Sequence, residues 1–115
     1  MASPREIAEA FSRHRFDEAY EHLAPDIVWV LVGGERIEGR ETVISLCEET
    51  LTGLADTTTD FLRFLVIAGD EAVAVDVVAR YTDADGSATT VASCDLYEFD
   101  EGQVTTITSY TVEVS

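Results

Sequence analysis

The first half of the chain has the hydrophobic spacing of amphipathic helices. After Ser3-Pro4, a pair typical of a helix start, side chains of one face recur at steps of three and four, namely Ile7, Ala10, Phe11 and His14. A second, shorter helix is predicted over about 16–23, because Pro25 disfavours its continuation. A third helix is predicted over about 40–53 and ends at a glycine.

The remaining segments have the pattern of β-strands. Residues 27–32 form one strand, and Gly33-Gly34 turns it into a short return strand over 36–38. Four long strands follow, at 60–68, 72–82, 88–99 and 104–114. Short turns containing Gly and Asp join the long strands directly, which predicts an antiparallel meander.

These elements define an α+β fold. We expect a cone-shaped, curved antiparallel sheet with the three helices of the N-terminal half packed on its concave face. The deep end of such a cone can hold a ligand. The length of 115 residues and the absence of a linker-like segment predict a single domain over 1–115.

The charge of the chain excludes several classes of partner. The formal net charge is −16, from 23 acids against seven arginines and no lysine. Nucleic-acid backbones and anionic membrane surfaces both require basic side chains, so we expect neither partner. No apolar run has the length of a signal or a membrane span, which favours a soluble, cytoplasmic protein. Cys47 and Cys94 lack any zinc-binding spacing, so we expect reduced thiols and no metal.

Asp95 is the main candidate for chemistry, because it lies within the largely apolar stretch 91–99. Removing an unpaired carboxylate from water is costly. Two interpretations remain open. Asp95 accepts hydrogen bonds from Tyr97, Ser93 or a backbone group and only shapes the core. Alternatively, desolvation raises its pKa and the residue serves acid–base chemistry.

Three segments carry a resemblance to a known superfamily, namely 16–29, 37–43 and 94–104. With these segments and the order of its elements, nearly the whole chain resembles the nuclear-transport-factor-2-like superfamily. Its members include ketosteroid isomerases, SnoaL-like polyketide cyclases, scytalone dehydratase and limonene epoxide hydrolase. Many other members are not catalytic, so the resemblance implies the fold more strongly than a reaction.

The resemblance implies roles for individual residues. Asp95 matches the protonated oxyanion-hole donor of the ketosteroid isomerases, and also an acid of the SnoaL-like cyclases that acts as a base. The general-base position of the isomerases is Leu31 here, and their donor tyrosine falls near Ile7. An acid of the epoxide-hydrolase relay falls near Ser109. These departures disfavour steroid isomerisation and epoxide hydrolysis.

Strand alternation predicts which side chains share a pocket with Asp95. We expect catalytic roles for Asp95, Tyr97 and His14, with His14 as a base or a partner at the pocket mouth. The expected substrate-binding residues are Trp29, Leu31, Phe61, Tyr81, Ser93 and Ser109. Trp29 and Tyr81 have an alternative role in the core, and His14 an alternative role as a helix cap stabilised by the helix dipole.

The opposite, even-numbered face of the strands is also apolar, which predicts a second covering layer. It includes Ala74, Val78, Cys94 and Leu96, and Asp76 and Arg80 are expected to pair there with each other or across a subunit boundary. Relatives of this fold often cover the face by pairing two sheets, so we expect a homodimer.

Two functional hypotheses follow. The first is a cofactor-independent cyclase, isomerase or dehydratase acting on an apolar, oxygen-bearing molecule such as a polyketide, because a positioned carboxyl suffices for proton transfer. The second is a non-catalytic ligand-binding or dimeric assembly module of the same fold. Asp95 favours the first hypothesis, and the missing base at Leu31 favours the second.

Overall fold

A single six-stranded sheet organises the computed structural model, which describes residues 2–114. The strands are β1 (Leu23–Leu31), β2 (Arg36–Glu38), β3 (Thr58–Ala68), β4 (Ala72–Thr82), β5 (Ala88–Asp100) and β6 (Gln103–Val114). They are ordered β2-β1-β6-β5-β4-β3 across the sheet. The four long strands pair antiparallel in succession, as the short turns between them predict. The pairing of β1 with β6 is parallel, whereas the sequence predicted an antiparallel sheet.

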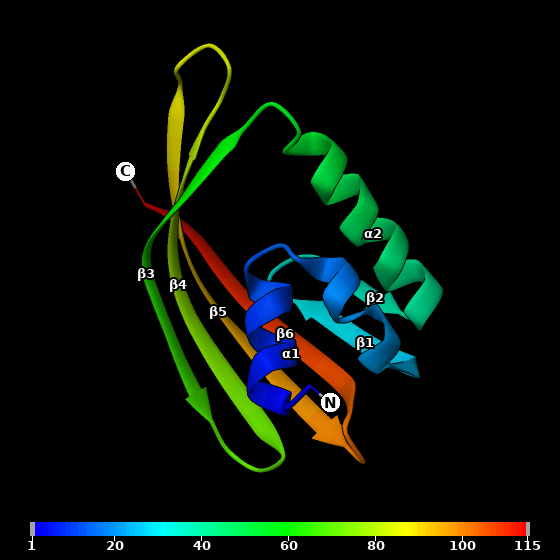
Figure 1. Ribbon diagram of the computed structural model, residues 1–115. Helices are drawn as coiled ribbons and strands as arrows, with labels where there is room; N and C mark the ends of the chain where they lie inside the picture. Colours follow the sequence, from blue (N-terminus) through cyan, green and yellow to red (C-terminus); the bar gives the residue numbers. More distant parts are fainter. Residues whose placement is uncertain (1, 115) are drawn as a thin grey trace.

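Two α-helices lie on the same side of the long strands (Figure 1). They are α1 (Pro4–Ser12) and α2 (Arg40–Gly53). The start of α1 is a capping box, in which the Ser3 hydroxyl accepts from the Glu6 N–H at 3.2 Å and the Ser3 N–H donates to the Glu6 carboxylate at 3.0 Å. The predicted helix start at Ser3-Pro4 is therefore confirmed.

The helix predicted over 16–23 is replaced by two 3₁₀ turns, Phe16–Glu18 and Tyr20–His22. Their backbone hydrogen bonds join Ala19 to Phe16 and His22 to Ala19, at 2.9 Å each. A segment this short has too few residues to nucleate an α-helix by itself, whereas 3₁₀ turns are common connectors. Residues 2–114 therefore contain two α-helices where three helices were expected. Leu23, assigned to the helix from the sequence, instead begins β1 and is fully buried.

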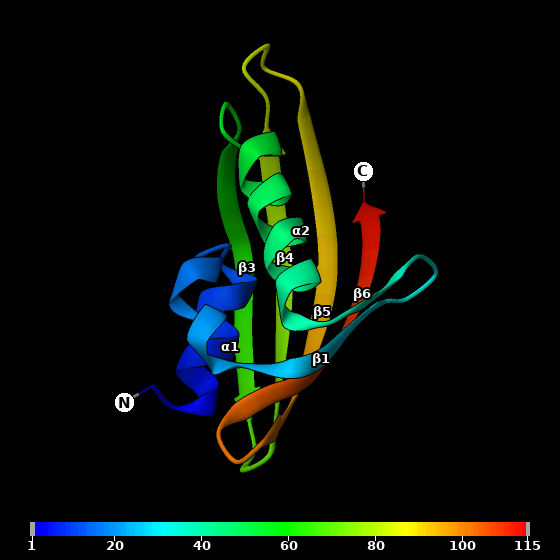
Figure 2. The ribbon, with the colours of Figure 1, turned by 90° about the vertical axis from the view of Figure 1, so that its right-hand side faces the viewer.

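The sheet bends around the helices, and β1 crosses the long strands in the view of Figure 2. The register shifts between Phe61 and Arg63 on β3, and between Glu98 and Phe99 where β5 pairs with β6. Such bulges increase local twist and bend a strand. The curvature leaves a concave face over which α1 and α2 pack, in agreement with the predicted fold class.

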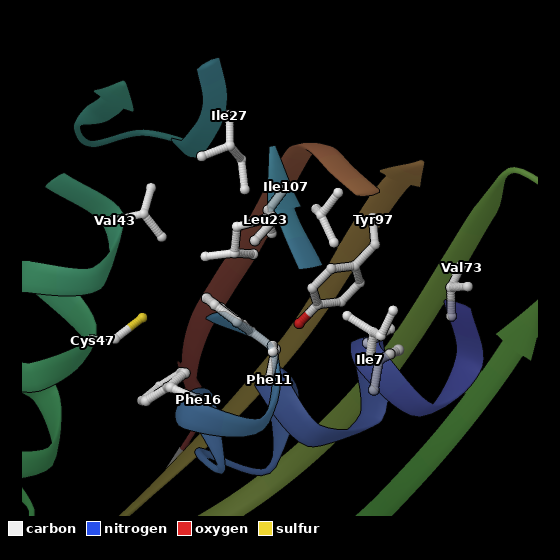
Figure 3. Packing of buried hydrophobic residues seen from close by; sticks show 14 of the residues in the cluster. Ile7, Phe11, Phe16, Leu23, Ile27, Val43, Cys47, Val73, Tyr97 and Ile107 are labelled. Atoms are coloured by element: carbon white, nitrogen blue, oxygen red, sulfur yellow. The ribbon is translucent and has the colours of Figure 1, made fainter. Parts of the chain in front are cut away.

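The core fills the space between the helices and this concave face (Figure 3). Alternation along β4 places Val73, Val75, Val77 and Ala79 inward, all nearly inaccessible to solvent. Phe11 of α1 meets Tyr97 of β5 with ring centroids 5.9 Å apart in an edge-to-face arrangement. No helix within residues 2–114 is long and apolar enough to cross a membrane.

The convex face of the sheet is apolar and exposed. Its exposed side chains include Leu65, Ile67, Leu96, Tyr110 and Val112. Within the chain Asp76 pairs with Arg63 and not with Arg80, because it accepts from the Arg63 guanidinium at 2.9 Å, while the alternative of pairing across a subunit boundary stays a prediction. The bulge in β3 places Arg63 beside Val78 on β4, within reach of Asp76.

Candidate functional site

Asp95 is held by two serine hydroxyls that come from opposite sides. Ser12, the last residue of α1, donates to Asp95 Oδ2 at 3.0 Å. Ser109, which faces Asp95 directly across the β5–β6 pair, donates to Oδ1 at 2.7 Å. Both serines are buried. Each carboxyl oxygen of Asp95 has one neutral hydroxyl as its donor. Burial raises the pKa of Asp95, and the hydrogen bonds from Ser109 and Ser12 oppose that rise.

Two further side chains hold the serines. The indole Nε1 of Trp29 donates to Ser109 Oγ at 2.9 Å. The Tyr97 hydroxyl lies 2.6 Å from Ser12 Oγ, and either oxygen can be the donor. Tyr97 is fully buried, and burial is also the main cause of its strongly raised pKa. The result is one hydrogen-bonded row, Trp29–Ser109–Asp95–Ser12–Tyr97, built from β1, β6, β5 and α1.

Asp95 borders a pocket that is enclosed by the C-terminal end of α1, the segment that follows it, α2 and the strands β1, β4, β5 and β6. The cavity has a volume of about 200 Å³. Its wall is formed by Phe11, Ser12, His14, Phe16, Trp29, Thr50, Val77, Tyr81, Val91, Ser93, Asp95 and Thr111. Aromatic and aliphatic side chains supply most of this wall, and hydroxyls supply most of its polar atoms. Such a mixture is typical of a small-molecule site.

His14 enters this pocket from a helix end with an uncommon backbone conformation. Its φ is 65°, in the left-handed region that glycine usually occupies after a helix. The hydrogen bonds from His14 N–H to Phe11 and from Arg15 N–H to Ala10 close a Schellman motif. A histidine in this conformation has a strained backbone, and strained residues of this kind cluster at functional sites.

The His14 ring packs among aromatic side chains. Its centroid is 5.5 Å from Phe16, 6.1 Å from Phe61 and 6.0 Å from Tyr81. Burial lowers the pKa of His14, so the neutral imidazole is favoured near pH 7. The lowered pKa disfavours a charged imidazole at this helix end, whereas the His14 backbone is itself part of the cap of α1.

The structure brings together five of the side chains singled out from the sequence. Asp95, His14, Trp29, Tyr81 and Ser93 all line the pocket. Burial also raises the pKa of Tyr81, and the nearby Asp95 carboxylate adds to that rise. Their roles remain predictions, but their proximity shows that the odd-numbered face was correctly assigned.

Four expected features lie elsewhere. Tyr97 and Ser109 lie behind the pocket wall. Ser109 bonds to Asp95 directly, whereas Tyr97 bonds to Ser12, which in turn bonds to Asp95. Leu31 pairs with Ser109 at the end of β1 and is outside the lining. Phe61 is also outside it and packs edge-to-face on Phe64, with ring centroids 5.4 Å apart.

The donors expected for Asp95 also differ from those observed. Tyr97 and Ser93 were expected from neighbouring positions on one strand, but Ser12 and Ser109 are the donors. The signal for Ser12 is a small hydroxyl directly after Phe11 at the end of the buried helix face. Its distance of 83 positions from Asp95 hides the contact from any local pattern. Thr50 of α2 also lines the pocket, although the sequence did not single it out as a site residue.

The fold and this site define a class of protein. The chain belongs to the SnoaL-like domain family, whose model matches residues 5–107. This result confirms the nuclear-transport-factor-2-like resemblance seen in the sequence. A comparison with curated proteins gave no match.

Solved structures show the same architecture. A nuclear-transport-factor-2-like protein of unknown function from Cytophaga hutchinsonii is 29% identical, with a TM-score of 0.80 over 92% of this chain and 93% of that one. A similar protein of unknown function from Burkholderia pseudomallei is 25% identical, with a TM-score of 0.67 over 92% and 85%. A candidate polyketide cyclase from Xanthomonas campestris is 23% identical, with a TM-score of 0.70 over 90% and 83%, and shows the fold alone.

Proposed function

We propose that this protein is a cofactor-independent acid–base enzyme of the cyclase or isomerase kind that acts on an apolar, oxygen-bearing molecule. One observation carries the proposal. The Asp95 carboxyl is exposed to an apolar pocket while serine hydroxyls hold both of its oxygens. The candidate polyketide cyclase among the structural neighbours is consistent with that class of substrate.

The hydrogen-bonded row suits a group that must change protonation state. Trp29 Nε1 can only donate, so the Ser109 oxygen accepts from it and the Ser109 hydrogen remains available to Asp95. The Ser12–Tyr97 contact has no such constraint, since either hydroxyl can donate. When Asp95 is ionised, Tyr97 donates to Ser12 and Ser12 to Asp95. When Asp95 is protonated, it donates to Ser12 and Ser12 donates to Tyr97, while Ser109 continues to donate to Asp95, so Asp95 keeps both hydrogen bonds.

A proton cycle follows from this arrangement. Ionised Asp95 takes a proton from a carbon beside a substrate carbonyl, and the C–H electron pair forms the enolate. The neutral imidazole of His14, when its N–H faces the pocket, donates a hydrogen bond to the enolate oxygen. Protonated Asp95 then returns its proton, either to another carbon or to the alkoxide formed when the enolate closes a ring. The enzyme ends in its starting state, and proton and electrons balance.

Exchange of substrate hydrogen for deuterium tests this cycle without knowledge of the natural substrate. Cyclohexanone in D₂O should lose its α-hydrogens faster with the protein than without it, as followed by proton NMR. Asp95→Asn should abolish the acceleration, because an amide cannot accept the proton. Val32→Ala, at an exposed position, serves as the matched control and should exchange like the wild type. Equal exchange by wild type and Asp95→Asn would contradict the proposal.

The second hypothesis is a ligand-binding module without turnover. The composition of the pocket wall favours it, because Asp95 is the only one of the described residues lining the pocket that has a carboxyl group. Leu31, at the expected base position, contributes nothing to the wall. Ligand binding without exchange in any tested ketone would support this alternative.

We also propose that two copies pair through the convex face of the sheet. Exposed apolar side chains gather there, and association would remove them from water. Two chains of net charge −16 repel, but on this face Arg63 bonds to Asp76 and Arg80 lies opposite Asp60, so part of the negative charge is offset. The exposed apolar side chains and this partial offset together favour the convex face for approach of a second copy.

A further inference from the structure

The size of the pocket limits what can enter it. The cavity of about 200 Å³ is smaller than the roughly 300–1,000 Å³ of sites for drug-sized ligands. A dry cavity of about 150 Å³ is enough to admit benzene. The available space therefore matches one substituted ring and does not match a molecule of several fused rings.

The walls of the pocket favour a flat ring. Phe11 contacts Phe16 and Trp29 edge-to-face, with ring centroids 4.9 Å and 5.2 Å apart. Together with His14 and Tyr81, these side chains form most of the apolar wall. Edge-to-face contacts fix the ring orientations, so the wall presents a preformed aromatic surface. The hydroxyls of Ser12 and Ser93 lie with Asp95 at the polar part of the wall.

The electrostatics of the pocket favour a neutral ligand. Within residues 2–114 the wall contains no arginine, and burial keeps His14 neutral near pH 7. The nearby Arg13 guanidinium lies 3.8 Å from the centre of the Phe64 ring, outside the pocket wall. An anionic ligand would thus lose its hydration, find no cation and meet Asp95.

We propose that the ligand is a neutral molecule with a single six-membered ring, whose hydroxyl or carbonyl oxygen lies at the Asp95–Ser12 end of the pocket. This inference rests on the proposed function and names its substrate class. The inference excludes carboxylates and phosphates from the Asp95–Ser12 end of the pocket. It also excludes molecules with four fused rings as ligands.

Two matched comparisons test size and charge separately. For size, phenol is compared with equilenin, a phenol fused into four rings. For charge, 4-hydroxybenzamide is compared with 4-hydroxybenzoate, which has nearly the same shape but one negative charge at pH 7. Binding is followed by the NMR signal of the Trp29 indole N–H, since that group lies at the pocket and bonds to Ser109. Phe64→Leu, outside the wall, serves as a control variant.

We expect phenol and the benzamide to shift the Trp29 signal saturably, in wild type and in Phe64→Leu alike. Equilenin should leave the signal unchanged, and the benzoate should bind at least about tenfold more weakly than the benzamide. Equal binding of equilenin and phenol overturns the size limit, and equal binding of the two benzoyl compounds overturns the charge limit. Absence of any shift overturns the inference as a whole. Phenol binding combined with equal α-hydrogen exchange by wild type and Asp95→Asn supports the ligand class and contradicts the enzyme proposal.

Discussion

Ser109 donates to Asp95 Oδ1 at 2.7 Å, while its own hydroxyl accepts from the Trp29 indole. The pairing register of β5 and β6 places Ser109 directly opposite Asp95. Because an indole N–H cannot accept, the Trp29–Ser109 bond has a fixed direction and leaves the Ser109 hydrogen available to Asp95. The contact of Ser12 with Asp95 has no fixed direction, and the two serines therefore play different parts around one carboxyl.

The difference between the serines is measurable as a pKa. Ser109→Ala removes a donor whose bond is stronger to the ionised carboxylate than to the neutral acid, so the pKa of Asp95 should rise. Ser12→Ala removes a donor to the ionised form and an acceptor for the protonated form, so the rise should be smaller. Titration of the Asp95 carboxyl carbon by NMR checks this order. A larger rise in Ser12→Ala would show that the Ser12 arm does not reverse.

Tyr97→Phe should lower the free energy of unfolding by about 1 kcal/mol, because it removes one buried hydrogen bond and keeps the ring. Tyr97→Ala should cost about 3–5 kcal/mol through the cavity that it leaves in the core. Urea denaturation followed by tryptophan fluorescence measures both values. An unchanged stability in Tyr97→Phe would mean that the contact with Ser12 contributes nothing to folding.

Asp95 should make stability depend on pH. Burial raises its pKa in the folded protein above that of the unfolded chain, so folding favours the protonated acid. Its contribution is fully present below the ordinary aspartate pKa, near 3.8, and is lost as the pH rises through the raised pKa. Asp95→Asn cannot ionise and escapes that loss. The stability of the variant relative to wild type should therefore increase from pH 3.5 to 7, measured by urea denaturation at each pH. A constant difference would contradict the raised pKa.

The proposed dimer predicts a solution mass near twice the chain mass of 12.6 kDa. Ile67→Asp introduces a charge on the convex face, where Ile67 is 61% exposed, and should reduce the mass to that of one chain. Val32→Asp, at an exposed apolar residue that follows β1, is the control and should leave the dimer intact. Light scattering coupled to size-exclusion chromatography measures all three proteins. A monomeric wild type at micromolar concentration would refute the pairing.

Much of the fold could be predicted because its signals are local. The alternation of Val73, Val75 and Val77 assigns the inner face of β4, and Ser3 with Glu6 marks the start of α1. The segment 16–23 was assigned wrongly because its apolar spacing suits an α-helix, while its short length and connecting role favour 3₁₀ turns. Sequence pattern reports the face of an element better than its exact hydrogen bonding.

The sequence by itself determined that one carboxyl, Asp95, would lie on the inner face of an apolar strand, because side chains alternate along any strand. Only the tertiary structure decided its partners. Ser12 reaches it from the end of α1 and Ser109 from β6, positions set by helix packing and strand register. The same long-range geometry leaves Leu31 and Phe61 outside the pocket wall. Distances between elements depend on packing of the whole core, and no local pattern encodes them.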